Sequence, residues 1–245
     1  MSKFVVQATW DDVPHLTPAA KQELLAGIPP YQRDARTKGV PQLGFGAIYP
    51  LPESEILVDD FEIPPYYPRS YGLDVGWNRT AAVWGARSND TGVIYLYSEY
   101  YRGQAEPVVH AEAIKSRGAW IPGVIDPASR GRSQRDGQIL IEDYRALGLD
   151  LESSLNAVEA GIYEVWQLLS FGKLKVFKSL SNWLMEFRIY QRDEHGKVVK
   201  SNDHLMDATR YFILSGRDRM HIKPQKPKEH IEYRYPHQEH TGWMR

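Results

Sequence analysis

The chain has 245 residues, 42% of them hydrophobic and 12% aromatic, and a formal net charge of −1, enough apolar content for one domain with a full core plus appendages. It has no cysteine, which excludes disulfides, thiolate zinc sites and thiol catalysis and suits a reducing cytoplasm. No stretch approaches the roughly 20 apolar residues of a membrane span, the N-terminus lacks the pattern of a signal peptide, and a near-zero charge requires any nucleic-acid surface to be local.

Residues 1–66 are predicted to form a linker-like subdomain. We expect a strand over 4–9 and a helix that begins at Thr17 or Pro18 and runs through Leu25. Turns rich in proline and glycine follow up to the end of this segment.

Residues 67–216 are predicted to form the core. The expected strands cover 71–75, 80–87, 92–101, 122–126, 149–152 and 174–177. The expected helices cover 106–117, 138–147, 157–170, 179–191 and 203–215. Antiparallel strands followed by strand–helix alternation predict an α/β fold with a mixed sheet, but the order alone allows several such folds.

Residues 217–245 lack hydrophobic periodicity and are predicted to be a flexible, mildly basic tail. The histidines scattered through it match no ligand spacing, so we expect a solvated tail rather than a metal site.

Two carboxylates and an imidazole open the last predicted helix, in the segment Asn202–Tyr211. Asn202 or Asp203 is well placed as the N-cap. Asp207 falls outside the apolar stripe of the helix, and helical spacing puts Asp203 and His204 within one turn of it. An aspartate inside a helix has poor propensity and no capping duty, which favours a functional role for Asp207.

Two predicted strands end in an aspartate. Asp74 lies between glycines in an apolar strand, where a carboxylate is costly unless it is paired. Asp126 ends its strand because Pro127 cannot donate to a sheet ladder, although an Asp-Pro pair is also an ordinary turn former. Oxygen ligands suit Mg²⁺ and Mn²⁺, and pairs of such ions about 3.5–4 Å apart recur in phosphodiester cleavage.

These segments resemble the nuclease domain of the large terminase subunit of tailed bacteriophages. The resemblance covers most of the chain and rests on Ala8–Leu16, Gly72–Gly76, Ile125–Asp126 and Lys200–Tyr211, the last of which is the most specific. It implies a ribonuclease-H-like (retroviral-integrase-like) α/β fold, a mixed sheet flanked by helices. It also implies a metal-dependent endonuclease that cuts concatemeric double-stranded viral DNA at the start and end of genome packaging.

The same resemblance implies a ligand set. Asp74, Asp126 and Asp207 would bind two Mg²⁺ or Mn²⁺ ions and carry catalysis. His204 would be either an additional ligand or a hydrogen-bonding partner of DNA. For Asp203, helix capping is favoured over metal binding.

Five basic residues are candidates for DNA contact. Three lie in a Ser/Gly-rich loop after Asp126, where guanidinium groups are suited to hold phosphates without reading sequence; the alternative is a solvated loop. The other two lie near predicted ligands and are weaker candidates. The five are Arg130, Arg132, Arg135, Arg79 and Lys200.

No Gly-x-x-x-x-Gly-Lys-Ser/Thr segment occurs, so the packaging ATPase is not in this chain. The resemblance implies that the ATPase domain precedes it in a longer protein. It also implies double-stranded DNA, the small terminase subunit and the portal protein as partners, in the host bacterial cytoplasm and away from membranes. Two alternatives remain: a non-catalytic DNA- or portal-docking module, and another ribonuclease-H-like nuclease such as a junction resolvase.

Overall fold

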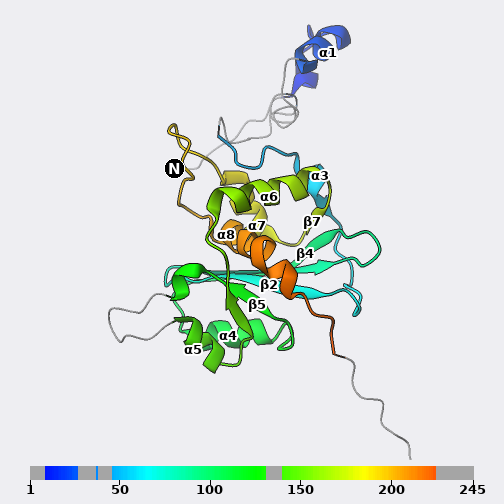
Figure 1. The fold of residues 1–245 in the computed structure, drawn as a ribbon. Coiled ribbons are helices and arrows are strands. Elements are labelled where there is room, and N and C mark those ends of the chain that lie inside the picture. The colour runs from blue at the N-terminus through cyan, green and yellow to red at the C-terminus, as the bar shows by residue number, and fades with distance from the viewer. Residues whose placement is uncertain (1–8, 27–36, 38–45, 131–139, 225–245) are drawn as a thin grey trace, which may run out of the picture.

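A computed structural model of the protein describes residues 9–26, 37, 46–130 and 140–224, with only the backbone of Arg130. Its centre is a seven-stranded mixed sheet in the order β1-β7-β4-β3-β2-β5-β6 (Figure 1). In chain order the strands are β1 (Leu57–Val58), β2 (Arg69–Asp74), β3 (Thr80–Arg87), β4 (Ile94–Arg102), β5 (Gly123–Ile125), β6 (Leu151–Ser153) and β7 (Leu174–Phe177).

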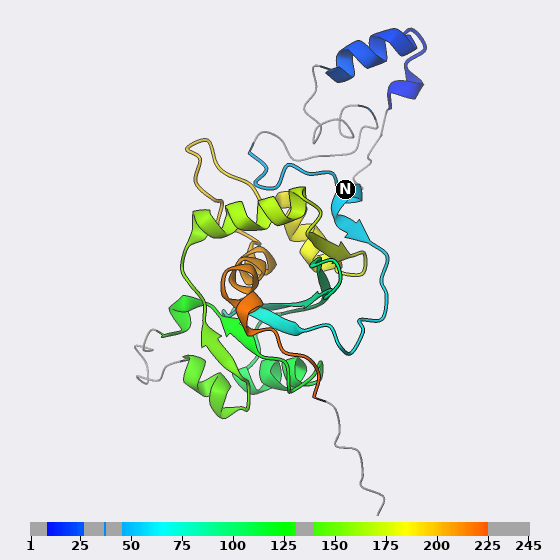
Figure 2. The ribbon, with the colours of Figure 1, turned by 45° about the vertical axis from the view of Figure 1, so that its right-hand side comes forward.

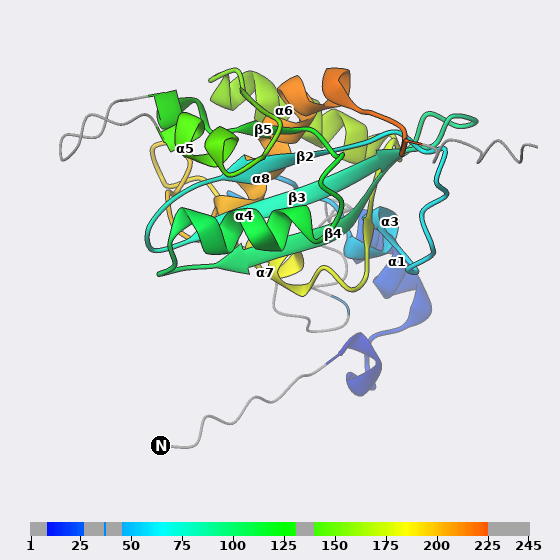
Figure 3. The ribbon, with the colours of Figure 1, turned by 90° about the horizontal axis from the view of Figure 1, so that it is seen from below.

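Helices cover both faces of the sheet. Helices α6, α7 and α8 lie on one face, and α4 and α5 lie on the other, as the views of Figures 1 and 3 agree. The helices are α1 (Pro18–Ala26), α3 (Glu53–Ile56), α4 (Pro107–Lys115), α5 (Leu140–Ala146), α6 (Val158–Ser170), α7 (Ser181–Ile189) and α8 (His204–Tyr211). Among the helices that the structure describes, none has the length and apolar content to cross a membrane.

The central strands explain why the sequence folds this way. In β3, Ala81 and Val83 pack with the core on the α8 side, while Ala82 and Trp84 pack with the core on the α4 side. A strand buried on both faces reads as a continuous apolar run. The predicted strands 80–87 and 174–177 coincide with β3 and β7, and the other core strands agree to within a few residues.

The last helix differs from the prediction in length and in environment. Helix α8 ends at Tyr211 and continues as a π-helical turn over Phe212–Gly216. Every residue from Leu205 to Tyr211 is buried, including Asp207 and Arg210. The helix lies between the sheet and helices α6 and α7, so it has no solvent face for the polar residues.

Helix α8 approaches the sheet closely because β2 carries a glycine beneath it. A Cβ on Gly72 would lie 2.0 Å from the carbonyl oxygen of Ala208, so only glycine fits there. Asp74 lies two residues farther along the same face of β2, and His204 lies one turn earlier in α8. The packing therefore brings the start of α8 to the end of β2.

The ends of the core differ from the predicted boundaries. Helix α1 has no buried residue and stands apart from the sheet in Figure 2. By contrast, Ile48, Tyr49 and Ile56 lie in the main core, and β1 pairs with β7, so the segment before residue 66 contributes to the sheet. Beyond residue 216, the backbone of His221 pairs with that of Arg69. The predicted strand over 4–9 and the tail from 225 lie outside the described residues, apart from Thr9.

Replacing Gly72 with alanine should destabilise the protein. The added methyl group has to push α8 off β2, and overpacking of this kind costs about 1–3 kcal/mol or more. Urea unfolding of the Gly72→Ala variant measures the loss. Gly76→Ala is the matched control, because its Cβ would meet a carbonyl oxygen only at 3.0 Å. Equal stability of the two variants would contradict the close approach.

Candidate active site

The ends of two neighbouring parallel strands bring Asp74 and Asp126 together. Leu73 pairs with Ile125 in the sheet, and the amide of Asp126 donates to the carbonyl of Leu73 at 3.0 Å. Leu73 and Ile125 both pack into the core on the α4 side. Because side chains alternate along a strand, the next residues, Asp74 and Asp126, face the α8 side at the same edge of the sheet.

His204 joins this pair from α8. Its Nδ1 donates to Oδ2 of Asp74 at 2.9 Å, and the two side chains are 33% and 13% exposed, respectively. Burial raises the pKa of the Asp74 carboxyl; the hydrogen bond from His204 opposes this rise, and the charges of Asp207 and Asp126 add to it. The hydrogen bond to Asp74 raises the pKa of His204. In the described part of the chain Oδ1 of Asp74 makes no hydrogen bond.

Among the described residues, Asp126 is held through one carboxylate oxygen. Its Oδ1 accepts hydrogen bonds from the hydroxyl of Tyr211 at 3.1 Å and from the amide of Ala128 at 3.0 Å. Burial raises the pKa of the Tyr211 hydroxyl, and the carboxylates of Asp207, Asp126 and Asp74 raise it further, so Tyr211 is a neutral donor. Within the described residues, Oδ2 of Asp126 is left without a hydrogen-bond donor.

Asp207 is neutralised from both sides. Arg210, 2% exposed, donates to Oδ1 through Nη2 at 2.9 Å and Nε at 3.2 Å. Lys200, 58% exposed, donates to Oδ2 at 3.1 Å. Burial alone would lower the pKa of Lys200, but the charges of Asp207 and Asp203 raise it. Arg210 is thus fixed by burial, whereas the ammonium group of Lys200 is accessible to solvent.

The prediction that Asp203 caps α8 with its side chain is wrong. Asp203 occupies the N-cap position, but its side chain makes no capping hydrogen bond, and its Oδ2 lies 3.2 Å from Nζ of Lys200. The cap comes from Glu186 in α7, whose Oε2 accepts the amides of Leu205 at 2.5 Å and Met206 at 3.4 Å.

Sequence reasoning missed Glu186. The available signal was a carboxylate inside the apolar segment Trp183–Phe187, where burial is costly unless the charge finds a partner. Its partners are the backbone amides of a helix 19 and 20 residues away, and spacing along the chain does not reveal such contacts.

The predicted DNA-contacting residues fall into two groups. Arg79 stacks on the ring of Tyr101, with its guanidinium carbon 4.4 Å from the ring centre, and Lys200 lies among the carboxylates. Arg132, Arg135 and the side chain of Arg130 lie outside the described residues.

The carboxylate oxygens at the strand ends suit a divalent ion. Asp74 and Asp126 each offer a carboxylate oxygen that no described group occupies, and hard oxygen donors are what Mg²⁺ and Mn²⁺ prefer. No group of three or more His, Asp or Glu side chains within the described ranges already converges on one ion position. The residues therefore fit a metal site at Asp74 and Asp126, while both oxygens of Asp207 are paired with Arg210 and Lys200.

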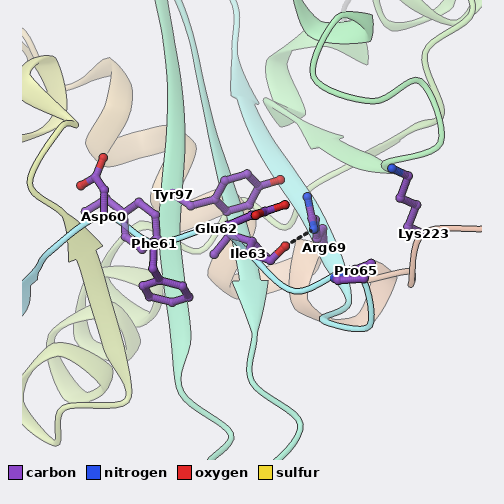
Figure 4. A pocket seen from close by; sticks show the side chains of 9 residues that line it. Asp60, Phe61, Glu62, Ile63, Pro65, Arg69, Tyr97 and Lys223 are labelled. Atoms are coloured by element: carbon purple, nitrogen blue, oxygen red, sulfur yellow. Dashed lines mark hydrogen bonds between the residues drawn. The ribbon is translucent and has the colours of Figure 1, made fainter.

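A cavity elsewhere in the molecule is separate from this site. It has a volume of about 740 Å³ and is lined by Asp60, Glu62, Arg69 and Lys223 among others (Figure 4). Arg69 begins β2, whereas Asp74 ends it, so this cavity lies toward the opposite end of the strand.

The fold and the strand-end aspartates define a ribonuclease-H-like α/β protein. The model of the terminase RNaseH-like domain family matches residues 71–215. The large terminase subunit of Salmonella phage P22 is 34% identical over an alignment of 239 residues that covers 93% of this chain and 48% of the P22 protein. The chain belongs to the terminase RNaseH-like domain family, as the resemblance predicted, and it spans about half the length of the curated relatives it matches.

Solved structures agree with this assignment. The structure of the P22 large terminase nuclease domain matches with a TM-score of 0.67 and 31% identity, covering 74% of this chain and 96% of that one. The large terminase nuclease of thermophilic phage G20c with bound cobalt shares the fold at 14% identity, with a TM-score of 0.51 over 69% of this chain and 97% of that one. The predicted ribonuclease-H-like fold is therefore confirmed.

The stability of the metal-free protein should fall as the pH rises above about 6.5, the ordinary pKa of histidine. The pKa of His204 is raised in the folded protein, so its ion pair with Asp74 contributes fully below that value and is lost as the pH passes the folded-state pKa. Burial lowers the pKa of His110, so this residue reduces the stability of the folded protein as the pH falls below about 6.5. It does not affect the change expected at higher pH.

Melting temperatures in chelator between pH 6 and 8 test this expectation. The His204→Asn variant should show a flatter profile than the wild type above about pH 6.5. Parallel profiles for the two proteins would show that the Asp74–His204 pair does not contribute to stability.

Proposed function

We propose that this domain is a divalent-metal-dependent DNA endonuclease that cuts concatemeric double-stranded viral DNA at the start and end of genome packaging. The observation that carries the proposal is the pair Asp74 and Asp126 at adjacent strand ends, each with one oxygen that no described group occupies, in a member of the terminase RNaseH-like domain family. Family membership argues against a junction resolvase. A docking module alone would not need carboxylates at this edge of the sheet.

In the proposed site Asp74, Asp126 and Asp207 would together hold two Mg²⁺ or Mn²⁺ ions. When bound, such ions stabilise charge on the phosphodiester oxygens and lower the pKa of the attacking water. His204 orients Asp74 through its Nδ1 hydrogen bond, and Tyr211 orients Asp126. His204 is a further candidate ligand, and Asp203 is a weaker candidate.

Arg210 and Lys200 have different tasks in this proposal. Arg210 is buried and keeps Oδ1 of Asp207 neutralised in every state. Lys200 neutralises Oδ2 until metal and substrate arrive, and its ammonium group then turns to a DNA phosphate. This exchange relieves the repulsion among the three aspartates in the metal-free protein and reconciles the observed ion pair with a DNA contact.

The remaining contacts are proposed from the resemblance and from chemistry. Arg130, Arg132, Arg135 and Arg79 would hold DNA phosphates, which positions the duplex without reading its sequence. In the whole packaging motor the partners would be the ATPase domain, the small terminase subunit and the portal protein. The site of action would be the host bacterial cytoplasm.

Asp74→Asn and Asp126→Asn should each reduce Mn²⁺-dependent nicking of supercoiled plasmid by on the order of 100-fold or more, because each removes a ligand oxygen. Melting temperature in chelator should change little for Asp74→Asn, because the relieved repulsion offsets the lost ion pair with His204, and should change little or rise for Asp126→Asn. Asp90→Asn, an exposed aspartate in the turn between β3 and β4, is the control and should cut normally. Cutting by the Asp74 variant at the wild-type rate would sink the proposal.

Lys200→Met should bind Mn²⁺ several-fold more tightly than the wild type in the absence of DNA, because methionine keeps the apolar stem but no longer competes as a cation for Asp207. The same variant should melt at a lower temperature in chelator, where Asp207 and Asp203 lose their exposed partner. Titration calorimetry measures the affinity. Unchanged Mn²⁺ affinity would show that Lys200 does not occupy the ion position.

A further inference from the structure

Glu186 is a carboxylate in the core that no part of the proposed chemistry uses. It lies on α7 and is 0% exposed, and the same helix buries Trp183, Leu184 and Phe187. Its Oε2 accepts the backbone amides of Leu205 and Met206, in the first turn of α8. The first amides of a helix have no partners within the helix, and a negative charge beside them is favourable.

Burying the carboxylate of Glu186 carries a desolvation cost, so packing alone does not explain why a glutamate occupies this position. Burial raises the pKa of Glu186, while the nearby Tyr101 hydroxyl and the amide of Leu205 oppose the rise. In the described part of the chain, Oε1 makes no hydrogen bond of normal geometry. An apolar side chain of similar size would fill the space without this desolvation cost. What an apolar residue cannot supply is the anchor for two amides of α8.

The anchored turn is the one that carries the candidate ligands. His204, which contacts Asp74, immediately precedes Leu205, and Asp207 follows Met206. On its other side α8 rests against Gly72, so the helix is held between a backbone contact near its middle and Glu186 at its start. The Asp203 side chain does not cap the helix, and no other side chain in the described residues accepts a hydrogen bond from these two amides.

We infer that Glu186 is a positioning residue for the metal site: it fixes the start of α8 so that His204 meets Asp74 and Asp207 faces the same edge of the sheet. The inference about metal affinity rests on the proposed function, whereas the inference about helix position does not. Residues that orient ligands without touching the metal affect its affinity by about 10–100-fold.

The protein contains a matched control for this inference. Glu99 on β4 caps the start of α7 in the same manner, accepting the amide of Asn182 through Oε1 at 3.0 Å and the amide of Trp183 through Oε2 at 2.8 Å. Helix α7 carries none of the candidate ligands. A change at Glu99 therefore removes a similar cap and lowers stability without loosening His204 or Asp207 directly.

The experiment compares Glu186→Ala, Glu186→Gln and Glu99→Ala. Three quantities are measured: Mn²⁺ affinity by electron paramagnetic resonance, amide hydrogen exchange at Leu205 and Met206, and plasmid nicking. Glu186→Ala should expose both amides to exchange and weaken Mn²⁺ binding about 10-fold or more. Glu186→Gln keeps an acceptor oxygen and should restore most of the affinity. Glu99→Ala should lower the melting temperature but leave Mn²⁺ affinity within about two-fold of the wild type.

Two results would overturn the inference: Glu186→Ala with unchanged exchange at both amides, or Glu99→Ala weakening Mn²⁺ binding as much as Glu186→Ala. If Glu186→Ala does not fold, Glu186→Asp replaces it, because the shorter side chain draws the carboxylate back from the amides and should weaken Mn²⁺ binding as well. A wild-type protein that neither binds Mn²⁺ nor cuts DNA would defeat the proposed function instead, and the exchange measurements would still decide whether Glu186 anchors α8.

Discussion

The packing of α8 against β2 is the constraint on which the rest of the site depends. At Gly72 the carbonyl of Ala208 lies where any side chain would begin, so the backbone of the helix sits directly on the strand. This contact sets the height and direction of α8 above the sheet. One turn earlier in the helix and two residues later in the strand, the same geometry brings His204 to Asp74. Without the glycine the helix would stand farther off and the two side chains would separate.

The close packing brings three aspartates together, and their mutual repulsion is offset by basic side chains that differ in exposure to solvent. Asp74, Asp126 and Asp207 are near enough for their charges to raise the pKa of the Tyr211 hydroxyl together. Arg210 is buried beside Asp207 and shielded from solvent. His204 is partly exposed, and Lys200 lies mostly in solvent. The cluster thus has one permanent counter-charge and two that can respond to ions or phosphates.

The sequence predicted the features that depend on local pattern. The apolar run of β3, the proline after Asp126 and the glycines around Asp74 are local signals, and each predicted its strand or strand end correctly. The environment of α8 was not predictable, because its polar residues Asp207 and Arg210 are buried together as an ion pair. Two contributions from distant segments were also missed. Strand β1 has only two residues, too few to show a pattern, and Glu186 contacts α8 across an interface between helices that spacing along the chain does not reveal.

Two helices of the core are capped by carboxylates that belong to other elements. Glu99 on the central strand β4 holds the start of α7, and Glu186 on α7 holds the start of α8, which carries His204 and Asp207. Each carboxylate fixes its own helix by the unpaired amides of the first turn, so the start of α8 is held by Glu186 rather than by a capping residue of its own. Asp203 does not cap α8 with its side chain and pairs with Lys200 instead, which places a fourth carboxylate near Asp74, Asp126 and Asp207.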